Sequence, residues 1–353
     1  MLSVPASPES TDMLNIARNY SLLGHNTFGI DARTAVFVEY GSEPELQEAA
    51  RMLREGALPS PWLHIGGGSN LLLTRDWPGT VLHSAIRGCD VVSEGDGFVE
   101  VRAGSGVVWD GFVEMCVEHG WYGAENLSAI PGEVGAAAVQ NIGAYGVEVK
   151  DLILEVEAMD MTDGQKRIFP AADCGYGYRR SIFKQQENRK YVVLSVLFRL
   201  GLRPHFNLGY KALAEALAGR ENVSLRDVRE AVMAVRSSKL PDPSETGSAG
   251  SFFTNPVVSR DKLAELQRQW PAVPFYEVRD NAGSVKLSAG WLIEQSGWKG
   301  RSLGRAGVWP RQALVLVNLG GADGREIVAL ADAVQASVRD RFGVELRPEV
   351  NII

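Results

Sequence analysis

Ser251 stands in an unusual setting for a hydroxyl side chain. The stretch 247-GSAGSFFTNP-256 surrounds it with glycine and alanine and then adds two adjacent phenylalanines. A surface loop does not need the aromatic pair, and a core strand does not need so many small residues. No G-x-S-x-G pattern encloses Ser251, and no histidine lies within forty residues to activate it. The pattern therefore does not favour a serine nucleophile.

A glycine-rich turn could hold a phosphate-containing ligand. In 66-GGGSN-70, which follows the apolar segment 61-PWLHI-65, backbone N–H groups can approach a phosphate without obstruction by a Cβ atom. Gly66 and Gly68 match the first two glycines of the dinucleotide pattern G-x-G-x-x-G, but Leu71 replaces the third. A purely structural turn remains the alternative, and a nicotinamide Rossmann dehydrogenase is disfavoured.

A second stretch, 131-PGEVGAAAVQNIGAYG-146, consists mostly of small side chains, interrupted by Gln140, Asn141 and Tyr145. A core segment would use larger residues to fill space. The composition therefore favours a flat, bulky ligand lying against this backbone. A tight crossing of a helix and a loop is the alternative.

Charged side chains could supply an anion site. Arg179 lies in 174-CGYGYRRSIFK-184, and an arginine fork is suited to holding a carboxylate in two places. Lys239 precedes the Ser251 stretch, and Glu349 lies on the polar face of the C-terminal segment. Solvent-exposed charges, including those of an edge strand that contains a proline, are the alternative interpretation.

Seven motifs in order resemble the UDP-N-acetylenolpyruvoylglucosamine reductase (MurB) family. The resemblance extends from about Ser21 to the C-terminus and therefore covers nearly the whole chain. The motifs are 26-NTFGID-31, 66-GGGSN-70, 131-PGEVGAAAVQNIGAYG-146, 176-YGYRRSIFK-184, 247-GSAGSFFTNP-256, 287-LSAGWLIEQSGWKG-300 and 347-RPEV-350.

The resemblance implies a catalytic trio of Arg179, Ser251 and Glu349. Arg179 and Glu349 match the positions that polarise the substrate carboxylate, an arrangement that is intelligible if Glu349 holds or shares a proton. Ser251 matches the proton donor, which makes it a general acid. The implied reaction is reduction of UDP-N-acetylglucosamine enolpyruvate to UDP-N-acetylmuramate, a peptidoglycan precursor, with non-covalent FAD as cofactor and NADPH as co-substrate.

The resemblance also implies binding residues, each matched by position. The cofactor-binding set is Gly66, Gly67, Gly68, Ser69, Asn70, Pro131, Gly132, Gly135, Ala136, Gln140, Asn141, Gly143 and Ala144. The substrate-binding set is Tyr178, Tyr210, Lys239, Asn255 and Gln312. Tyr210 would belong to a loop that closes over the substrate.

Two residues depart from the family pattern. Arg180 replaces an acidic residue that often follows the catalytic arginine, which would make the site more basic. Glu133 replaces a small or neutral residue, and near the FAD phosphates its charge would repel them. Glu133 is therefore expected to point to solvent.

Composition narrows the class of protein. The 353 residues carry a formal net charge of −7, which disfavours general binding of nucleic acid or anionic membranes. We expect a cytoplasmic monomer, without metal ligands at paired spacing, without membrane insertion and without a signal peptide. The alternatives are another FAD-dependent oxidoreductase of the same fold, acting for example on an alcohol, and a non-catalytic UDP-sugar binding protein.

The helices and strands expected from the sequence, which must position the candidate site residues, indicate an α+β protein. We expect a two-part FAD-binding region of the PCMH/vanillyl-alcohol-oxidase type and a smaller α+β substrate-binding domain. The capping-box pair Asp323 and Glu326 predicts the start of a long helix. The alternation over 344-VELRPEVNII-353 predicts a terminal strand. The expected ranges are 1–12 for a flexible tail, 13–88 plus 344–353 for the first FAD-binding domain, 89–238 for the second, and 239–343 for the substrate-binding domain.

Overall fold

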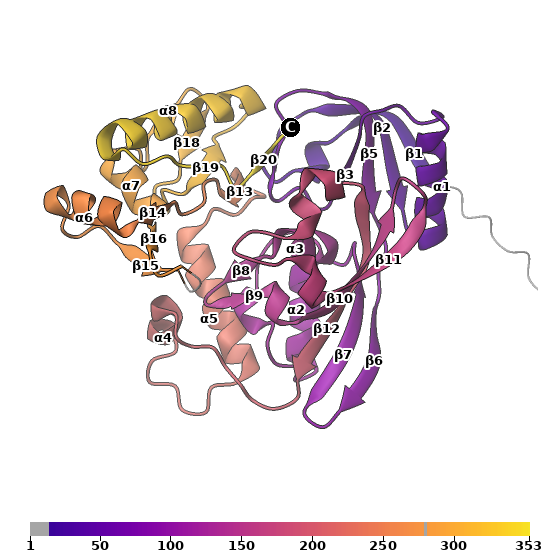
Figure 1. Cartoon of the computed structure of the whole chain (residues 1–353), viewed down its shortest axis with the longest axis horizontal. Helices are drawn as coiled ribbons and strands as arrows, with labels where there is room; N and C mark the ends of the chain where they lie inside the picture. The colour runs from indigo at the N-terminus through magenta and orange to yellow at the C-terminus, as the bar shows by residue number, and fades with distance from the viewer. Residues whose placement is uncertain (1–13, 279–280) are drawn as a thin grey trace, which may run out of the picture.

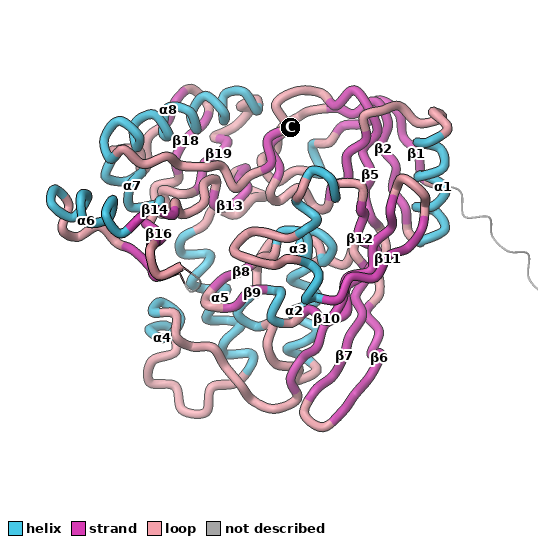
Figure 2. The backbone as a smooth tube through the Cα atoms, viewed as in Figure 1, coloured by secondary structure: helices cyan, strands magenta, loops and turns pink. Residues whose placement is uncertain are grey.

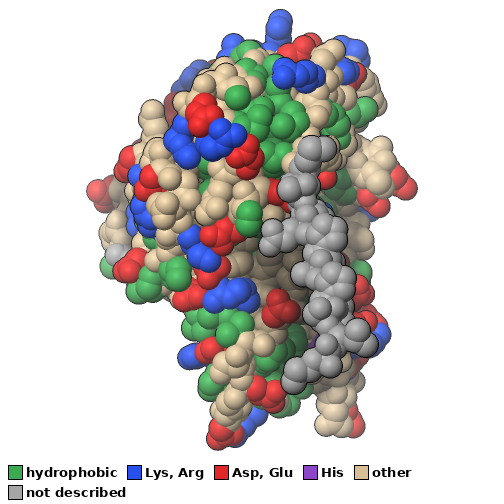
Figure 3. Space-filling view, turned by 90° about the vertical axis from the view of Figure 1, so that its right-hand side faces the viewer, with side chains coloured by type: hydrophobic (Ala, Val, Ile, Leu, Met, Phe, Trp, Pro, Cys, Tyr) green, Lys and Arg blue, Asp and Glu red, His purple; other side chains and the backbone are tan. Residues whose placement is uncertain are grey.

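The computed structural model describes residues 14–278 and 281–353 (Figure 1). The predicted tail, residues 1–12, lies outside the described residues. None of the helices within the described ranges combines the length and apolarity that a membrane span requires. On the face shown in Figure 3, acidic and basic side chains are interspersed among the described residues rather than gathered by sign.

Four strands form the N-terminal sheet, in the order β1-β2-β5-β3. Strand β1 (Asn15–Ser21) is antiparallel to β2 (Arg33–Tyr40), whereas β5 (Trp77–Ser84) runs parallel to both β2 and β3 (Trp62–Ile65). Helix α1 (Glu43–Arg54) makes the crossover from β2 that parallel strands require. The first glycine turn therefore leaves the sheet at the end of β3.

Five antiparallel strands form the second sheet, in the order β11-β10-β12-β7-β6. These strands are β6 (Cys89–Gly95), β7 (Phe98–Gly104), β10 (Ile153–Asp160), β11 (Gln165–Pro170) and β12 (Tyr191–Gly201). The long apolar run of β12 is buried, whereas β7 alternates buried and partly exposed residues, as a strand with one covered face does.

Helices cover one face of this second sheet. Helix α2 (Trp109–Glu118) and the short helix α3 (Val134–Gln140) share a hydrophobic core with β7 and β12. Helix α4 (Lys211–Ala216) packs against α5 (Leu225–Lys239) in a smaller cluster. Helix α3 lies in the small-residue stretch, so this segment is a short helix followed by a loop.

The C-terminal part contains two smaller sheets. One has the order β13-β19-β18-β17 and the other β14-β16-β15. Helix α8 packs on β18 and β19, on the outer side of the molecule (Figure 2). The elements are β13 (Gly247–Ser251), β14 (Val257–Ser259), α6 (Arg260–Gln269), β15 (Phe275–Glu277), β16 (Ser284–Leu287), α7 (Ala289–Gln295), β17 (Ser302–Leu303), β18 (Ala306–Val308), β19 (Val315–Asn318) and α8 (Gly324–Phe342).

The predicted strand over residues 344–353 forms only at its end. Strand β20 (Asn351–Ile352) pairs in parallel with β4 (Leu71–Leu72), next to the first glycine turn. Pro348 has no N–H to give to a ladder and makes only an isolated bridge with Phe253. The C-terminus therefore returns to the N-terminal part of the chain.

Short elements complete the described chain. They are β8 (Gly143–Ala144), β9 (Val147–Glu148), η1 (Leu23–His25), η2 (Glu125–Leu127), η3 (Val149–Asp151), η4 (Ala171–Cys174), η5 (Ile182–Lys184) and η6 (Gln186–Asn188). One hydrophobic cluster includes Phe28, Phe37 and Val81 from the N-terminal part together with Phe252 and Leu292 from the C-terminal part. The N-terminal sheet and the C-terminal sheets are therefore joined by a shared core.

Candidate active site

A cavity of about 1590 Å³ brings the chemically suggestive stretches together. It is lined by both glycine-rich stretches, by the end of β13 and by the C-terminal segment. Fourteen of the predicted site residues line it, and they are Gly66, Gly67, Gly68, Ser69, Asn70, Pro131, Gly132, Gly135, Ala136, Gln140, Gly143, Arg179, Ser251 and Glu349.

The first glycine turn is fixed by close backbone contacts. Gly68 has a φ of +63°, and a Cβ atom there would lie 2.0 Å from the carbonyl oxygen of His25. Only glycine fits such a position. The Ser69 hydroxyl donates to the carbonyl of Pro131 at 2.9 Å, and the Asn70 amide donates to the carbonyl of Glu349 at 3.3 Å. The turn thus contacts the second glycine stretch and the C-terminal segment.

The small-residue stretch approaches the cavity with its backbone. Gly132 has a φ of +121°, and a Cβ atom there would lie 2.8 Å from the Ser69 hydroxyl. Asn141 and Ala144 are not among the residues that line the cavity. The Asn141 side chain is fully buried and donates to the carbonyl of Gly177 at 2.8 Å while accepting from the backbone of Lys150. Asn141 therefore holds the loop together rather than facing a ligand.

Arg179 lies in a tight turn between Gly177 and Arg180, whose backbone groups pair with each other. Its φ of +53° is left-handed, which is uncommon for a residue with a long side chain and marks local strain. Its guanidinium donates to the carbonyl of Gly143 at 3.1 Å. Its Nε lies 2.5 Å from Oε1 of Glu349, as an ion pair rather than an aligned hydrogen bond. The fork is therefore aimed at the cavity wall beside Glu349.

Ser251 and Glu349 come from distant parts of the chain but share a backbone connection. Ser251 ends β13, and the next residue, Phe252, accepts a hydrogen bond at its carbonyl from the Glu349 backbone N–H at 2.8 Å. The hydroxyl and the carboxylate are thus placed by two hydrogen-bonded segments on one side of the cavity. The arrangement brings a proton-donating group, a cation and a carboxylate to a single space.

Lys184 is a cavity residue to which the sequence motifs assigned no role. Its Nζ donates to the Gln140 side chain at 2.8 Å and to the Arg179 carbonyl at 3.1 Å. Burial lowers the pKa of Lys184, against the opposing influence of the Glu349 charge. Lys184 belongs to the basic stretch 174–184, but nothing in the spacing of that stretch separates a buried lysine from one exposed to solvent.

The five predicted substrate residues lie outside the set that lines the main cavity. Gln312 lines a second cavity of about 320 Å³, and the Asn255 side chain accepts from the backbone N–H of Ala289 at 2.9 Å. Tyr210 is exposed and contacts the Tyr145 ring edge-on at 5.1 Å, and Lys239 is the last residue of α5. Their roles remain predictions.

Tyr178, also in the substrate set, contacts a second lysine that sequence reasoning missed. Lys286, on β16, places its Nζ 4.0 Å from the centre of the Tyr178 ring, which is a cation–π contact. Burial lowers the pKa of Lys286. Because the two residues are far apart in the sequence, no local pattern could have paired them.

The two departures from the family pattern have different outcomes. Arg180 is exposed and is not among the cavity-lining residues, so its charge is directed away from the cavity. The expectation that Glu133 points to solvent is wrong. Glu133 is only 7% exposed, lines the cavity and contacts Nε2 of His83 through Oε1 at 3.1 Å. A charged partner, invisible in the local sequence, allows its burial.

Comparisons with known proteins give consistent matches. A family model described as "UDP-N-acetylenolpyruvoylglucosamine reductase, C-terminal domain" matches residues 242–353, and one described as "FAD binding domain" matches residues 34–168. The chain is 54% identical to a UDP-N-acetylenolpyruvoylglucosamine reductase of Bacteroides fragilis, over 95% of this chain and 99% of that protein. It is 46% identical to a Porphyromonas gingivalis protein of the same name, over 96% and 100% of the two chains.

Solved structures give the same picture of the fold. UDP-N-acetylenolpyruvylglucosamine reductase from Thermus caldophilus is similar with a TM-score of 0.68 and 23% identity, over 96% of this chain and 99% of that chain. A solvent-stable cholesterol oxidase is similar with a TM-score of 0.53 and 11% identity, over 95% and 87%. Because both solved structures are less than 25% identical to this chain, the similarity shows a shared fold and does not by itself show a shared function. The predicted α+β class, with an FAD-binding region of the vanillyl-alcohol-oxidase type, is confirmed.

Proposed function

This chain belongs to the UDP-N-acetylenolpyruvoylglucosamine reductase family, and on that premise we propose that it reduces UDP-N-acetylglucosamine enolpyruvate to UDP-N-acetylmuramate. NADPH is the reductant and FAD the bound cofactor. The product is a precursor of peptidoglycan, and we further propose that the protein acts in cell-wall biogenesis, cell shape and cell division, as a cytoplasmic monomer. The observation that carries the proposal is the single cavity shared by Arg179, Ser251, Glu349 and both glycine stretches.

The residues of the cavity fit FAD. Its volume of about 1590 Å³ exceeds the roughly 300–1,000 Å³ of pockets for drug-sized ligands, as a dinucleotide requires. Gly66, Gly67 and Gly132 present backbone rather than side chains, so N–H groups can approach a diphosphate. Ala136 and Gly143 leave room for a flat ring system along the second stretch. When bound, FAD supplies hydride-transfer chemistry.

Arg179 binds and polarises the substrate carboxylate. Reduction at the vinyl carbon moves electrons toward this carboxylate, so the guanidinium stabilises the charge that develops there. The fork is oriented beforehand by the Gly143 carbonyl and by Glu349.

Ser251 donates the remaining proton to the carbon that bears the ether oxygen. It ends β13 and lines the cavity on the segment that is hydrogen-bonded to Glu349. A serine hydroxyl is a weak acid, so its placement matters more than its acidity, and general acid catalysis contributes roughly 10²–10⁴-fold. Lys184 and Asn141 hold the loop that carries Arg179.

The test is an anaerobic visible spectrum of the FAD-loaded protein during sequential additions. NADPH should bleach the flavin band, and UDP-N-acetylglucosamine enolpyruvate should then restore it. Ser251→Ala should leave the bleaching rate near normal and slow the recovery by about 10²-fold or more. Equal loss of both steps would refute the role of Ser251. A protein that bleaches but never recovers would move the assignment to another FAD-dependent oxidoreductase of this fold.

A further inference from the structure

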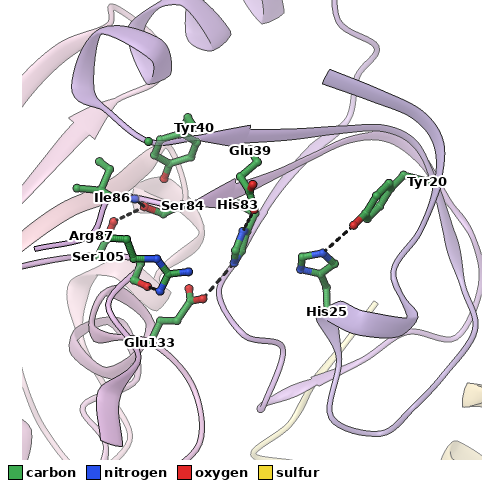
Figure 4. Close-up of polar contacts among 12 residues, drawn as sticks. Tyr20, His25, Glu39, Tyr40, His83, Ser84, Ile86, Arg87, Ser105 and Glu133 are labelled. Atoms are coloured by element: carbon green, nitrogen blue, oxygen red, sulfur yellow. Dashed lines mark hydrogen bonds and ion pairs between the residues drawn. The ribbon is translucent and has the colours of Figure 1, made fainter. Parts of the chain in front are cut away.

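A largely buried cluster of charged side chains is formed by His83, Glu39 and Glu133 (Figure 4). His83, on β5, lies between two carboxylates. Its Nδ1 is 3.0 Å from Oε2 of Glu39, which is its register partner on β2, and its Nε2 is 3.1 Å from Oε1 of Glu133. The side chains of His83 and Glu133 are 6% and 8% exposed, so this pair is shielded from water.

With Glu39 and Glu133 ionised, the contacts at both ring nitrogens make His83 the cation of the cluster. An ionised carboxylate only accepts hydrogen bonds, so a ring with a carboxylate at each nitrogen must donate from both nitrogens. Burial alone would lower the pKa of His83. The hydrogen bonds and charges of Glu133 and Glu39 outweigh burial and raise it above 6.5.

No other histidine facing His83 shares this charge. The His25 ring lies edge-on at 5.0 Å, and burial, followed by the charge of His83, lowers its pKa. Burial lowers the pKa of His64 to about 3, and His83 adds to that effect. Arg87, drawn in the same view, donates through its guanidinium to the carbonyl of Gly106. Arg87 keeps its charge at every pH of interest, so His83, the ion-pair partner of Glu133, is the cation of this cluster whose charge changes with pH.

Glu133 lies next to the glycine turn that would hold the diphosphate of FAD. A Cβ atom added at Gly66 would lie 3.2 Å from Oε2 of Glu133, and both residues line the cavity. An uncompensated carboxylate at this position would repel a diphosphate through a medium of low effective dielectric. Paired with the imidazolium, the same carboxylate contributes little net charge to the cavity.

We propose that His83 is a positioning residue for FAD, which neutralises Glu133 beside the diphosphate-binding turn and thereby makes cofactor affinity depend on the protonation of His83. The inference rests on FAD as the cofactor but not on the identity of the substrate. Loss of the proton leaves Glu39 and Glu133 uncompensated, and the negative charge of the cavity wall increases. FAD affinity should therefore fall as the pH rises.

The sign follows from the raised pKa of His83 in the folded protein. FAD should bind tightly while His83 is protonated in the apo-protein, and its affinity should fall as the pH rises through the pKa of His83, which lies above 6.5. Titration of the apo-protein with FAD, followed by flavin fluorescence at constant ionic strength, should show this loss. We expect the dissociation constant to increase about tenfold, which is within the ordinary range of coupling between two sites.

Three variants distinguish neutralisation of Glu133 by His83 from a purely structural role of His83. His83→Gln should bind FAD about tenfold more weakly at low pH and show no pH step. Glu133→Gln removes the charge that needs compensation, so it should bind FAD at least as tightly as the wild type, with a flattened pH profile. The double variant should recover the affinity of Glu133→Gln, because the carboxylate that repels the diphosphate is absent. The exposed His119, changed to Gln, is the matched control and should keep the wild-type profile.

Several outcomes would overturn the proposal. A pH-independent dissociation constant of the wild type would do so, as would a double variant that binds as weakly as His83→Gln, which indicates a merely structural histidine. If His83→Gln does not fold, the profile of Glu133→Gln decides, since a retained pH step would exclude Glu133 as the partner. Failure of the wild type to bind FAD at any pH would instead overturn the cofactor assignment itself, together with this inference.

Discussion

Arg179 combines a strained backbone with a side-chain fork that already has partners on two segments. Its left-handed φ of +53° persists because the turn around it is closed by backbone hydrogen bonds between Gly177 and Arg180. Its guanidinium contacts Gly143 and Glu349 at once. A point charge on a flexible stem cannot make both contacts in one geometry.

Arg179→Lys should therefore impair the step that uses the substrate carboxylate. We expect reoxidation of the flavin by the enolpyruvyl substrate to slow by about 10²-fold, the usual effect of removing one oriented donor. Reduction of the flavin by NADPH should stay near normal, and stopped-flow absorbance measures both steps. Arg180→Lys, at the exposed neighbour, is the control and should leave both rates unchanged. A similar loss in the two variants would contradict the assigned role.

Single residues show what local sequence could and could not predict. Arg179, Ser251 and Glu349 were assigned through long motifs, and the structure places all three on one cavity. Glu133 was misjudged because its burial depends on His83, fifty residues earlier, and no local pattern reports such a partner. Local motifs were sufficient to assign the three cavity residues, whereas the burial of Glu133 depends on a contact with a residue distant in the sequence.

Among the helices and strands, the start of a helix was predicted correctly because its capping residues lie next to one another in the sequence. Helix α8 begins at the predicted capping box, in which the Asp323 carboxylate accepts from Glu326 N–H at 3.0 Å. The C-terminal segment was predicted as a continuous strand, but Pro348 and the absence of a continuous partner limit it to β20. A capping box is complete within four residues, whereas a strand needs a neighbour.

The cap of α8 gives a direct test of element stability. Asp323→Ala removes the acceptor for the first turn and should lower the free energy of unfolding by about 1 kcal/mol. The matched control is Asp332→Ala, an exposed position inside the same helix, whose effect should stay within about 0.5 kcal/mol. Denaturant unfolding of the apo-protein measures both variants. Equal destabilisation would show that helical charge rather than capping is responsible.

At the scale of the whole molecule, one cavity is lined by residues that follow the N-terminal sheet strands and by the C-terminal segment. A core cluster joins Phe37 of the N-terminal sheet to Leu292 of α7, so the two parts share buried surface. The order of the motifs indicated the family, which the close relatives confirm. The domain limits stay a prediction. The return of residues 344–353 to the first FAD-binding domain was implied by the family resemblance, whereas local sequence patterns do not show which C-terminal residues line the cavity wall.

The C-terminal contacts should make cofactor binding depend on the last three residues. The backbone of Asn351 donates to Asn70 at 3.1 Å, that of Ile353 donates to Leu72 at 2.9 Å, and Thr74 donates to Ile353 at 2.7 Å. Ending the chain at Val350 removes these bonds, each worth about 1 kcal/mol. Because the bonds order the residues that follow the glycine turn, FAD affinity should fall by about tenfold or more, equivalent to roughly 1.4 kcal/mol.

Fluorescence titration of the apo-protein with FAD measures this loss, and Ile352→Ala is the control. The Ile352 side chain is exposed, so its removal keeps every backbone bond and should preserve the wild-type dissociation constant. Wild-type affinity in the truncated chain would mean that the turn is ordered by its own contacts to His25 and Pro131. Weakened binding only in the truncated chain would show that FAD binding needs Asn351 and Ile353, which line the cavity and whose backbones pair with the residues at and after the glycine turn.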